Sequence, residues 1–184
     1  MSSTRIQVGD RLPDLRLPRA GDEPTVRPLR GPHRDAAVVV VLHDPTCDAC
    51  ADYLRTLAEA VPDFDLWDGS VRAVVGPVRG AGPGPGRTAA TDGSGSGAAG
   101  GAVWSRSAAD LQDELGPDVD VLVDRDRALL DRVAASDGPV TLVADRYGQL
   151  FHLDGAGGEA GAHPGMEPRE LEEWLKYLAT QCPE

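Results

Sequence analysis

The sequence is poor in aromatic residues and in positive charge. Aromatic residues make up 4% of its 184 residues, so a hydrophobic core has to be built mainly from Val, Leu and Ala. The net charge is −12, which argues against a nucleic-acid partner because phosphate binding needs clustered Lys and Arg. The same excess of acidic residues disfavours binding to an anionic membrane surface.

The sequence also lacks an export signal and a long apolar run. Residues 1–10 contain no basic stretch followed by an apolar one, and no segment approaches the ~20 apolar residues of a membrane span. We therefore expect a cytoplasmic protein with a single domain over residues 1–184. Only three cysteines are present. In the reducing cytosol, paired cysteines are more often catalytic or metal-binding than structural.

Two of the cysteines form a C-x-x-C motif, Cys47 to Cys50. The motif follows a β-branched apolar run, Ala36–Leu42, which predicts a strand covered on both faces. A helical pattern of apolar residues over 50–61 comes next. At the start of a helix these two thiols can close a disulfide, and Cys47 faces the partial positive charge that favours its thiolate. A C-x-x-C motif at a strand-to-helix junction is typical of a thioredoxin-like redox site.

The rest of the chain predicts an α/β fold, with a central mixed β-sheet flanked by helices on both faces. Further strands are expected at Val71–Val75, Val119–Val123, Val140–Ala144 and Gln149–Leu153, the last two as an antiparallel hairpin. Further helices are expected at 107–115 with a capping box at its start, at 125–135 capped by Asp124, and from Pro168 with a buried stripe of Leu171, Trp174, Leu175 and Leu178. A Gly-rich insertion at about 76–103 is expected to be flexible and contains no dinucleotide-binding fingerprint.

Two segments resemble the redoxin branch of the thioredoxin superfamily. Residues Val8–Leu17 (VGDRLPDLRL) are similar to the opening segment of that branch, and Asp137–Gly148 (DGPVTLVADRYG) to its cis-proline strand and hairpin. The branch includes the alkyl hydroperoxide reductase/thiol-specific antioxidant (AhpC/TSA) proteins and the membrane-tethered cytochrome maturation reductases. The resemblance implies a thioredoxin-like fold in which Pro139 is cis and its backbone faces the Cys47–Cys50 pair.

These residues predict a thiol–disulfide oxidoreductase that needs no cofactor or metal. Cys47 is expected to be the nucleophile and Cys50 to resolve the mixed disulfide. Thr46 is expected to cap the helix or donate to the sulfur, and Pro139 to leave a main-chain edge free for an extended substrate. The expected partners are a disulfide-containing protein or a small-molecule thiol or peroxide, and a reductase that donates electrons. His43 is a candidate for assisting proton transfer, although a lone histidine at a strand end is more often packed or solvated.

The charges around the motif predict a reducing or sluggish redox couple. Asp44 and Asp48 oppose thiolate formation at Cys47, whereas the helix N-terminus favours it by roughly 0.3–1 kcal/mol. A disulfide is strongly oxidising when its reduced form is stabilised by a low thiolate pKa. Two nearby carboxylates work against that stabilisation.

Three other interpretations stay open from the sequence. An atypical thiol peroxidase is one, although neither cysteine carries the P-x-x-x-T-x-x-C motif of peroxiredoxins, since Val40 and Asp44 stand where Pro and Thr would precede Cys47. Thr46 also stands where thioredoxins have Trp before the first cysteine. A non-catalytic redoxin-fold interaction protein is the second. The third is a zinc site completed by His163 and Cys182, with Cys182 otherwise expected to be a free thiol.

Overall fold

The computed structural model describes residues 5–21, 26–29, 36–42, 45–76, 107–133, 138–155 and 165–181. The strands within these ranges are β1 (Arg16–Pro18), β2 (Val26–Pro28), β3 (Ala36–Leu42), β4 (Gly69–Val75), β5 (Val119–Val123), β6 (Val140–Ala144) and β7 (Leu150–Asp154). The helices are α1 (Asp48–Asp65), α2 (Ala108–Leu115), α3 (Leu130–Val133) and α4 (Pro168–Gln181). The Gly-rich insertion expected at 76–103 lies outside the described residues, apart from Gly76.

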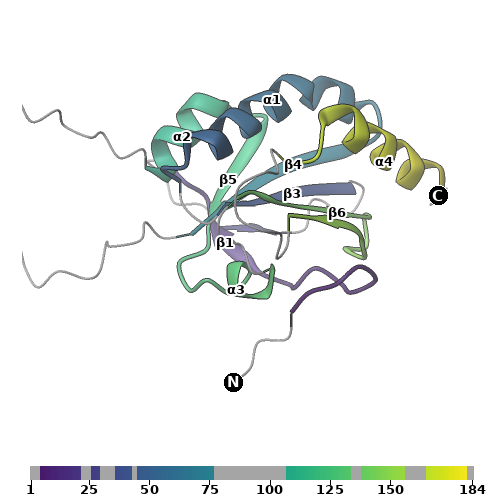
Figure 1. Cartoon of the computed structure of the whole chain (residues 1–184), viewed down its shortest axis with the longest axis horizontal. Coiled ribbons are helices and arrows are strands. Elements are labelled where there is room, and N and C mark those ends of the chain that lie inside the picture. The colour runs from purple at the N-terminus through teal and green to yellow at the C-terminus, as the bar shows by residue number, and fades with distance from the viewer. Residues whose placement is uncertain are drawn as a thin grey trace, which may run out of the picture.

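A mixed sheet with the strand order β5-β4-β3-β6-β7 forms the centre of the described part of the chain (Figure 1). β3 pairs in parallel with β4, and β4 with β5, whereas β6 runs antiparallel to β3 and β7 antiparallel to β6. The carboxyl ends of the three parallel strands therefore share one edge of the sheet, and the cysteine motif follows β3 at that edge. This confirms the predicted mixed α/β architecture.

β3 is the central strand and is buried on both of its faces, as its continuous apolar run predicts. Val38 and Val40 belong to one hydrophobic core, whereas Val39 and Val41 belong to the core on the opposite face. This division follows from the alternation of side chains along a strand. The strand that leads to the cysteines is thus held between two packed layers.

Helices cover the two faces of the sheet unequally (Figure 1). α1, α2 and α4 lie on one face, where Leu54, Leu111 and Leu171 share a core with the sheet. The short α3 and the N-terminal segment cover the other face, and Leu12 and Leu130 pack there. No helix within the described ranges is long and apolar enough to cross a bilayer.

One local expectation differs from the structure, and one pair of strands was not expected. The helix expected at 125–135 begins only at Leu130, as α3, because Arg127 has a left-handed backbone (φ 56°) that interrupts helical geometry before it. Residues 134 and 135 of the expected helix lie outside the described residues. Asp124 still caps this segment as expected. The Asp124 carboxylate accepts hydrogen bonds from the backbone N–H groups of Ala128, Leu129 and Leu130 at 2.8–3.1 Å. The β1–β2 hairpin was not expected, because three-residue strands in a proline-rich segment carry no alternation signal.

Candidate active site

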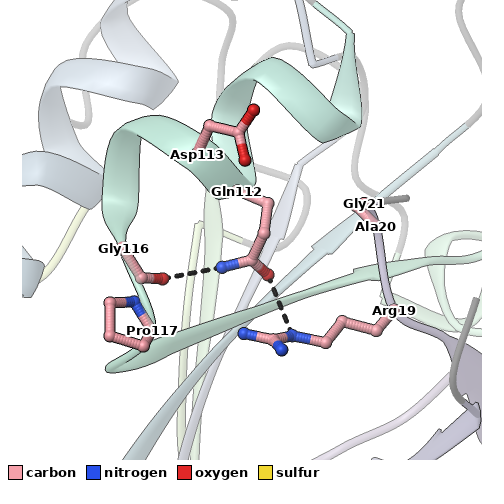
Figure 2. Close-up of a pocket in the computed structure, with 7 residues that line it drawn as sticks. All are labelled: Arg19, Ala20, Gly21, Gln112, Asp113, Gly116 and Pro117. Atoms are coloured by element: carbon pink, nitrogen blue, oxygen red, sulfur yellow. Dashed lines mark hydrogen bonds between the residues drawn. The ribbon is translucent and has the colours of Figure 1, made fainter. Parts of the chain in front are cut away.

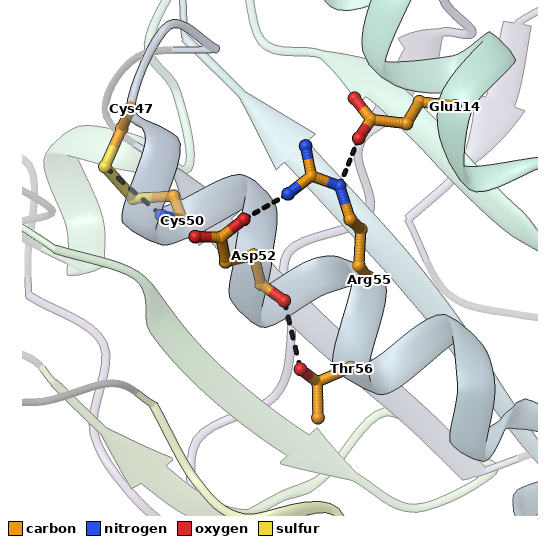
Figure 3. A network of polar contacts seen from close by, with 6 residues as sticks. All are labelled: Cys47, Cys50, Asp52, Arg55, Thr56 and Glu114. Carbon is orange, nitrogen blue, oxygen red and sulfur yellow. Dashed lines mark hydrogen bonds and ion pairs between the residues drawn. A yellow bond between two sulfur atoms is a disulfide. The ribbon is translucent and has the colours of Figure 1, made fainter.

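Cys47 and Cys50 form a disulfide at the start of α1 (Figure 3). Their Cα atoms lie 5.3 Å apart, within the usual range for a disulfide, so the bridge needs no displacement of the backbone. Cys47 is the N-cap of the helix, and its backbone is extended (φ −71°, ψ 107°). The pairing that the C-x-x-C spacing predicts is therefore present.

The two sulfur atoms differ in exposure and in hydrogen bonding. Cys47 is partly exposed, whereas Cys50 is fully buried in the core beneath α1. The backbone N–H of Cys50 donates to Sγ of Cys47 at 3.3 Å, and the Cys47 carbonyl accepts from the N–H of Ala51. A sulfur at this position accepts a hydrogen bond from a backbone N–H and lies at the positive end of the helix dipole. Both effects favour a thiolate on Cys47 after reduction.

Thr46 and Asp48 flank the exposed cysteine. The capping acceptor of the helix is the sulfur of Cys47, and Thr46 lies one position before this N-cap, so both roles expected for Thr46 stay predictions. Asp48 is exposed at the first helical position. Its carboxylate opposes the development of a second negative charge on the neighbouring sulfur.

Pro139 lies at the same edge of the sheet as the disulfide. Val140, the next residue, pairs with Val41 near the end of β3, and Pro139 itself is buried. No cis peptide bond occurs in the described ranges, which include Gly138 and Pro139, so the expectation of a cis Pro139 is wrong. The trans form of an X–Pro bond is favoured by about 0.5–1 kcal/mol.

Tyr53 joins α1 to the strand that follows Pro139, and sequence reasoning missed it. Its buried hydroxyl shares a hydrogen bond of 3.0 Å with Oγ1 of Thr141 and donates to the carbonyl of Met166 at 2.9 Å. Burial raises the pKa of Tyr53 to about 12. The phenol therefore stays neutral and fixes the first turns of α1 against β6. In the sequence, Tyr53 follows Cys50 by three residues and so lies on the same buried face of the helix. This spacing could have pointed to Tyr53 as a neighbour of the site.

Arg55 connects the same helix to α2 at the surface (Figure 3). Its guanidinium pairs with Asp52 on α1 and with Glu114 on α2. The hydrogen bond that Arg55 donates to the Glu114 carboxylate is the main cause of the raised pKa of Arg55. Exposed ion pairs contribute little to stability because water and salt screen them, so this group orients the two helices more than it stabilises them.

A pocket of about 390 Å³ lies next to α2, and its Gln112 side chain is hydrogen-bonded within the protein (Figure 2). Gln112 lines it, and its Nε2 donates to the carbonyls of Gly116 and Val119. Its Oε1 accepts from the N–H of Val121 and from Nε of Arg19. The amide is thus engaged at both ends in holding α2 to β5.

Several residues singled out in the sequence lie outside the described residues. These are His43, Asp44, His163 and Cys182. No group of three or more metal-ligating side chains is found in the ranges that the structure describes. The zinc interpretation depends on His163 and Cys182, so it stays an untested alternative.

Comparisons with known proteins identify the fold. No family model matches the sequence, and no curated protein matches it. Among solved structures, the chain is similar to a proposed thiol:disulfide interchange protein, DsbE, from Chlorobium tepidum, with 16% identity, a TM-score of 0.58, and coverage of 96% of this chain and 97% of that one. It is also similar to AhpC from Mycobacterium tuberculosis, with 14% identity, a TM-score of 0.58, and coverage of 96% and 95%.

A third similar structure is an exposed lipoprotein thioredoxin from Streptococcus pneumoniae. It shares 18% identity and a TM-score of 0.55, and the match covers 89% of this chain and all of that one (100%). These similarities extend over nearly the whole chain and confirm the thioredoxin-like fold. The protein is thus an α/β protein of thioredoxin-like fold with a C-x-x-C disulfide at the start of its first long helix.

Proposed function

We propose that the protein is a thiol–disulfide oxidoreductase that acts through Cys47 and Cys50. The observation that carries this proposal is the disulfide at the N-terminus of α1, with one sulfur accessible and the other buried. This asymmetry suits a two-step exchange, in which the outer sulfur meets the substrate and the inner one completes the reaction. The name of the interchange protein from Chlorobium tepidum supports the same chemistry.

In the proposed reaction the reduced protein transfers two electrons to a substrate disulfide. The Cys47 thiolate attacks one substrate sulfur, which forms a mixed disulfide and releases the other sulfur as a thiolate. The Cys50 thiolate then attacks Sγ of Cys47. This releases the second substrate thiolate and forms the Cys47–Cys50 disulfide seen in the structure. A separate reductase returns two electrons and two protons to the pair.

The proposed substrate is a disulfide-containing protein or small molecule, and the proposed site of action is the cytoplasm. Pro139, at the same sheet edge as the cysteines, is proposed to contribute main-chain contacts to an extended substrate. Thr46, directly before the nucleophile, is proposed to donate a hydrogen bond to its sulfur. Asp48 is expected to hold the couple on the reducing side.

The test is to follow insulin reduction by the purified protein in the presence of dithiothreitol. We expect activity above the uncatalysed rate that is abolished in Cys47→Ser. Cys50→Ser, reduced beforehand and mixed with insulin after the dithiothreitol has been removed, should instead accumulate a mixed disulfide with the substrate, which mass spectrometry detects. The variant Cys182→Ser serves as the matched control, because it removes a thiol outside the proposed pair and should retain activity. Activity that persists in Cys47→Ser contradicts the proposal.

A peroxide assay separates the proposal from the alternatives. The structural similarity to AhpC motivates the peroxidase alternative, in which Cys47 forms a sulfenic acid and Cys50 resolves it. Rapid hydrogen peroxide consumption without insulin reduction supports that reaction. Inertness in both assays supports a non-catalytic interaction protein.

A further inference from the structure

A groove of about 420 Å³ lies between β7 and α4 and includes neither cysteine of the disulfide. It is lined by Phe151, Glu170, Glu173, Trp174 and Tyr177. The whole chain has only two Phe, three Trp and three Tyr. Three of these few aromatic side chains therefore gather in one groove, and the groove's other lining residues are acidic.

The aromatic rings meet at steep angles. The rings of Trp174 and Tyr177 lie 6.0 Å apart, centroid to centroid, with 89° between their planes. Phe151 lies 6.5 Å from Tyr177 at 64°, and the His152 ring lies 5.4 Å from that of Trp174 at 46°. In such edge contacts the rim of one ring points at its neighbour, and all three rings line the same groove, so that more than one ring can contact the same bound group. The electron-rich face of an aromatic ring attracts a cation.

The acidic residues add negative charge at the same place. Glu170 and Glu173 are three residues apart on α4, so they lie on one side of the helix. Arg169 approaches Glu173 at 3.9 Å, but the two side chains are 86% and 71% exposed. Such a solvent-exposed pair contributes little and can give way to a ligand. A net charge of −12 further attracts cations to the molecule.

We propose that this groove binds a small organic cation with a quaternary ammonium head group. The compact ammonium of lysine is strongly hydrated, and its transfer onto aromatic rings loses that hydration. A quaternary ammonium has no N–H groups to leave without partners, and its methyl groups make apolar contacts with ring faces. The rings supply cation–π attraction and the two glutamates supply charge, which matches the lining of this groove.

The test compares choline with its neutral carbon isostere, 3,3-dimethylbutan-1-ol, by NMR titration of the ¹⁵N-labelled full-length protein at constant ionic strength. We expect choline to shift the indole N–H signal of Trp174 and the backbone signals of α4, with saturation at roughly 1–10 mM. The isostere should produce much smaller shifts. Equal binding of the two compounds shows a merely apolar groove and overturns the proposal. The absence of saturable choline shifts also overturns it.

Substitutions assign the binding to the groove. Tyr177→Leu keeps an apolar side chain but removes a ring, and Glu173→Gln removes a charge at nearly constant shape. Each should weaken choline binding by roughly two- to tenfold. Glu59→Gln removes the same charge from an exposed position on α1 and should leave choline binding unchanged. Equal weakening in Glu59→Gln and Glu173→Gln shows that net charge alone attracts choline, and this result contradicts a site.

Discussion

Replacing Tyr53 by Phe should destabilise the protein in a way that depends on pH. The Tyr53 hydroxyl bonds to Thr141 and Met166 inside the protein, and the side chain is only 7% exposed. The substitution removes one oxygen and leaves the ring in place, so no large cavity forms. At neutral pH the loss is expected to be about 1–3 kcal/mol, because buried polar groups on Thr141 and Met166 lose their partner.

The dependence on pH follows from the titration of the phenol. Burial raises its pKa from 10.0 in the unfolded chain to about 12 in the fold. The contribution of the neutral phenol to stability is therefore fully present below pH 10 and is lost as the pH rises toward 12. The complete difference corresponds to about 3 kcal/mol, and about half of it is lost between pH 9 and 11.

The assay is urea unfolding of wild type and Tyr53→Phe at several values of pH from 8 to 11. The free-energy difference between the two proteins should shrink by about 1 kcal/mol between pH 9 and 11. Tyr147→Phe is the matched control, because Tyr147 is 55% exposed. Removing its hydroxyl should give a free-energy difference from wild type that does not shrink in this way between pH 9 and 11. A constant difference between wild type and Tyr53→Phe over this range would refute the reasoning, since it would show that the phenol titrates alike in both states.

Two further predictions concern the redox pair and the packing around Tyr53. Asp48→Asn should raise the reduction potential by roughly 10–20 mV, measured in glutathione buffers, because the Cys47 thiolate loses a neighbouring negative charge and the reduced form is stabilised. An unchanged or lower potential contradicts this assignment. Gly165→Ala should cost about 2–4 kcal/mol in urea unfolding, because Gly165 has φ +87° and a Cβ there would lie 2.4 Å from the Tyr53 ring. Gly138→Ala, whose Cβ meets nothing within 4 Å, is its control and should change stability little.

The sequence predicts the central part of the fold well because its signals there are local. The run Ala36–Leu42 matches β3 residue for residue, and the predicted capping box is present at Ser107 and Asp110. The interruption by Arg127 was not predictable, since no local rule places an arginine in a left-handed conformation. α1 also continues through Pro62 to Asp65, beyond the predicted end at 61, because proline inside a helix destabilises it without always ending it.

The residue pattern predicted the candidate site only where its residues are close in sequence, and the resemblance to a family added Pro139 at the same sheet edge. The Cys47–Cys50 bridge follows from a spacing of three residues. The contacts of Tyr53 with Thr141 and Met166 join residues 88 and 113 positions apart, and no sequence pattern specifies such a pair. The isomer of Pro139 depends on packing around the bond, which the resemblance to a family did not determine.

The position of β3 between two cores has a consequence for electron transfer. The strand before the cysteines is buried on both faces, and Tyr53 ties the helix after them to β6. The disulfide thus lies between β3 and α1, two elements that packing and hydrogen bonding hold in place. Opening and closing the bridge should then involve mainly rotation of the cysteine side chains. The reorganisation that accompanies each turnover should be small, and amide hydrogen exchange in β3 should be equally slow in both oxidation states.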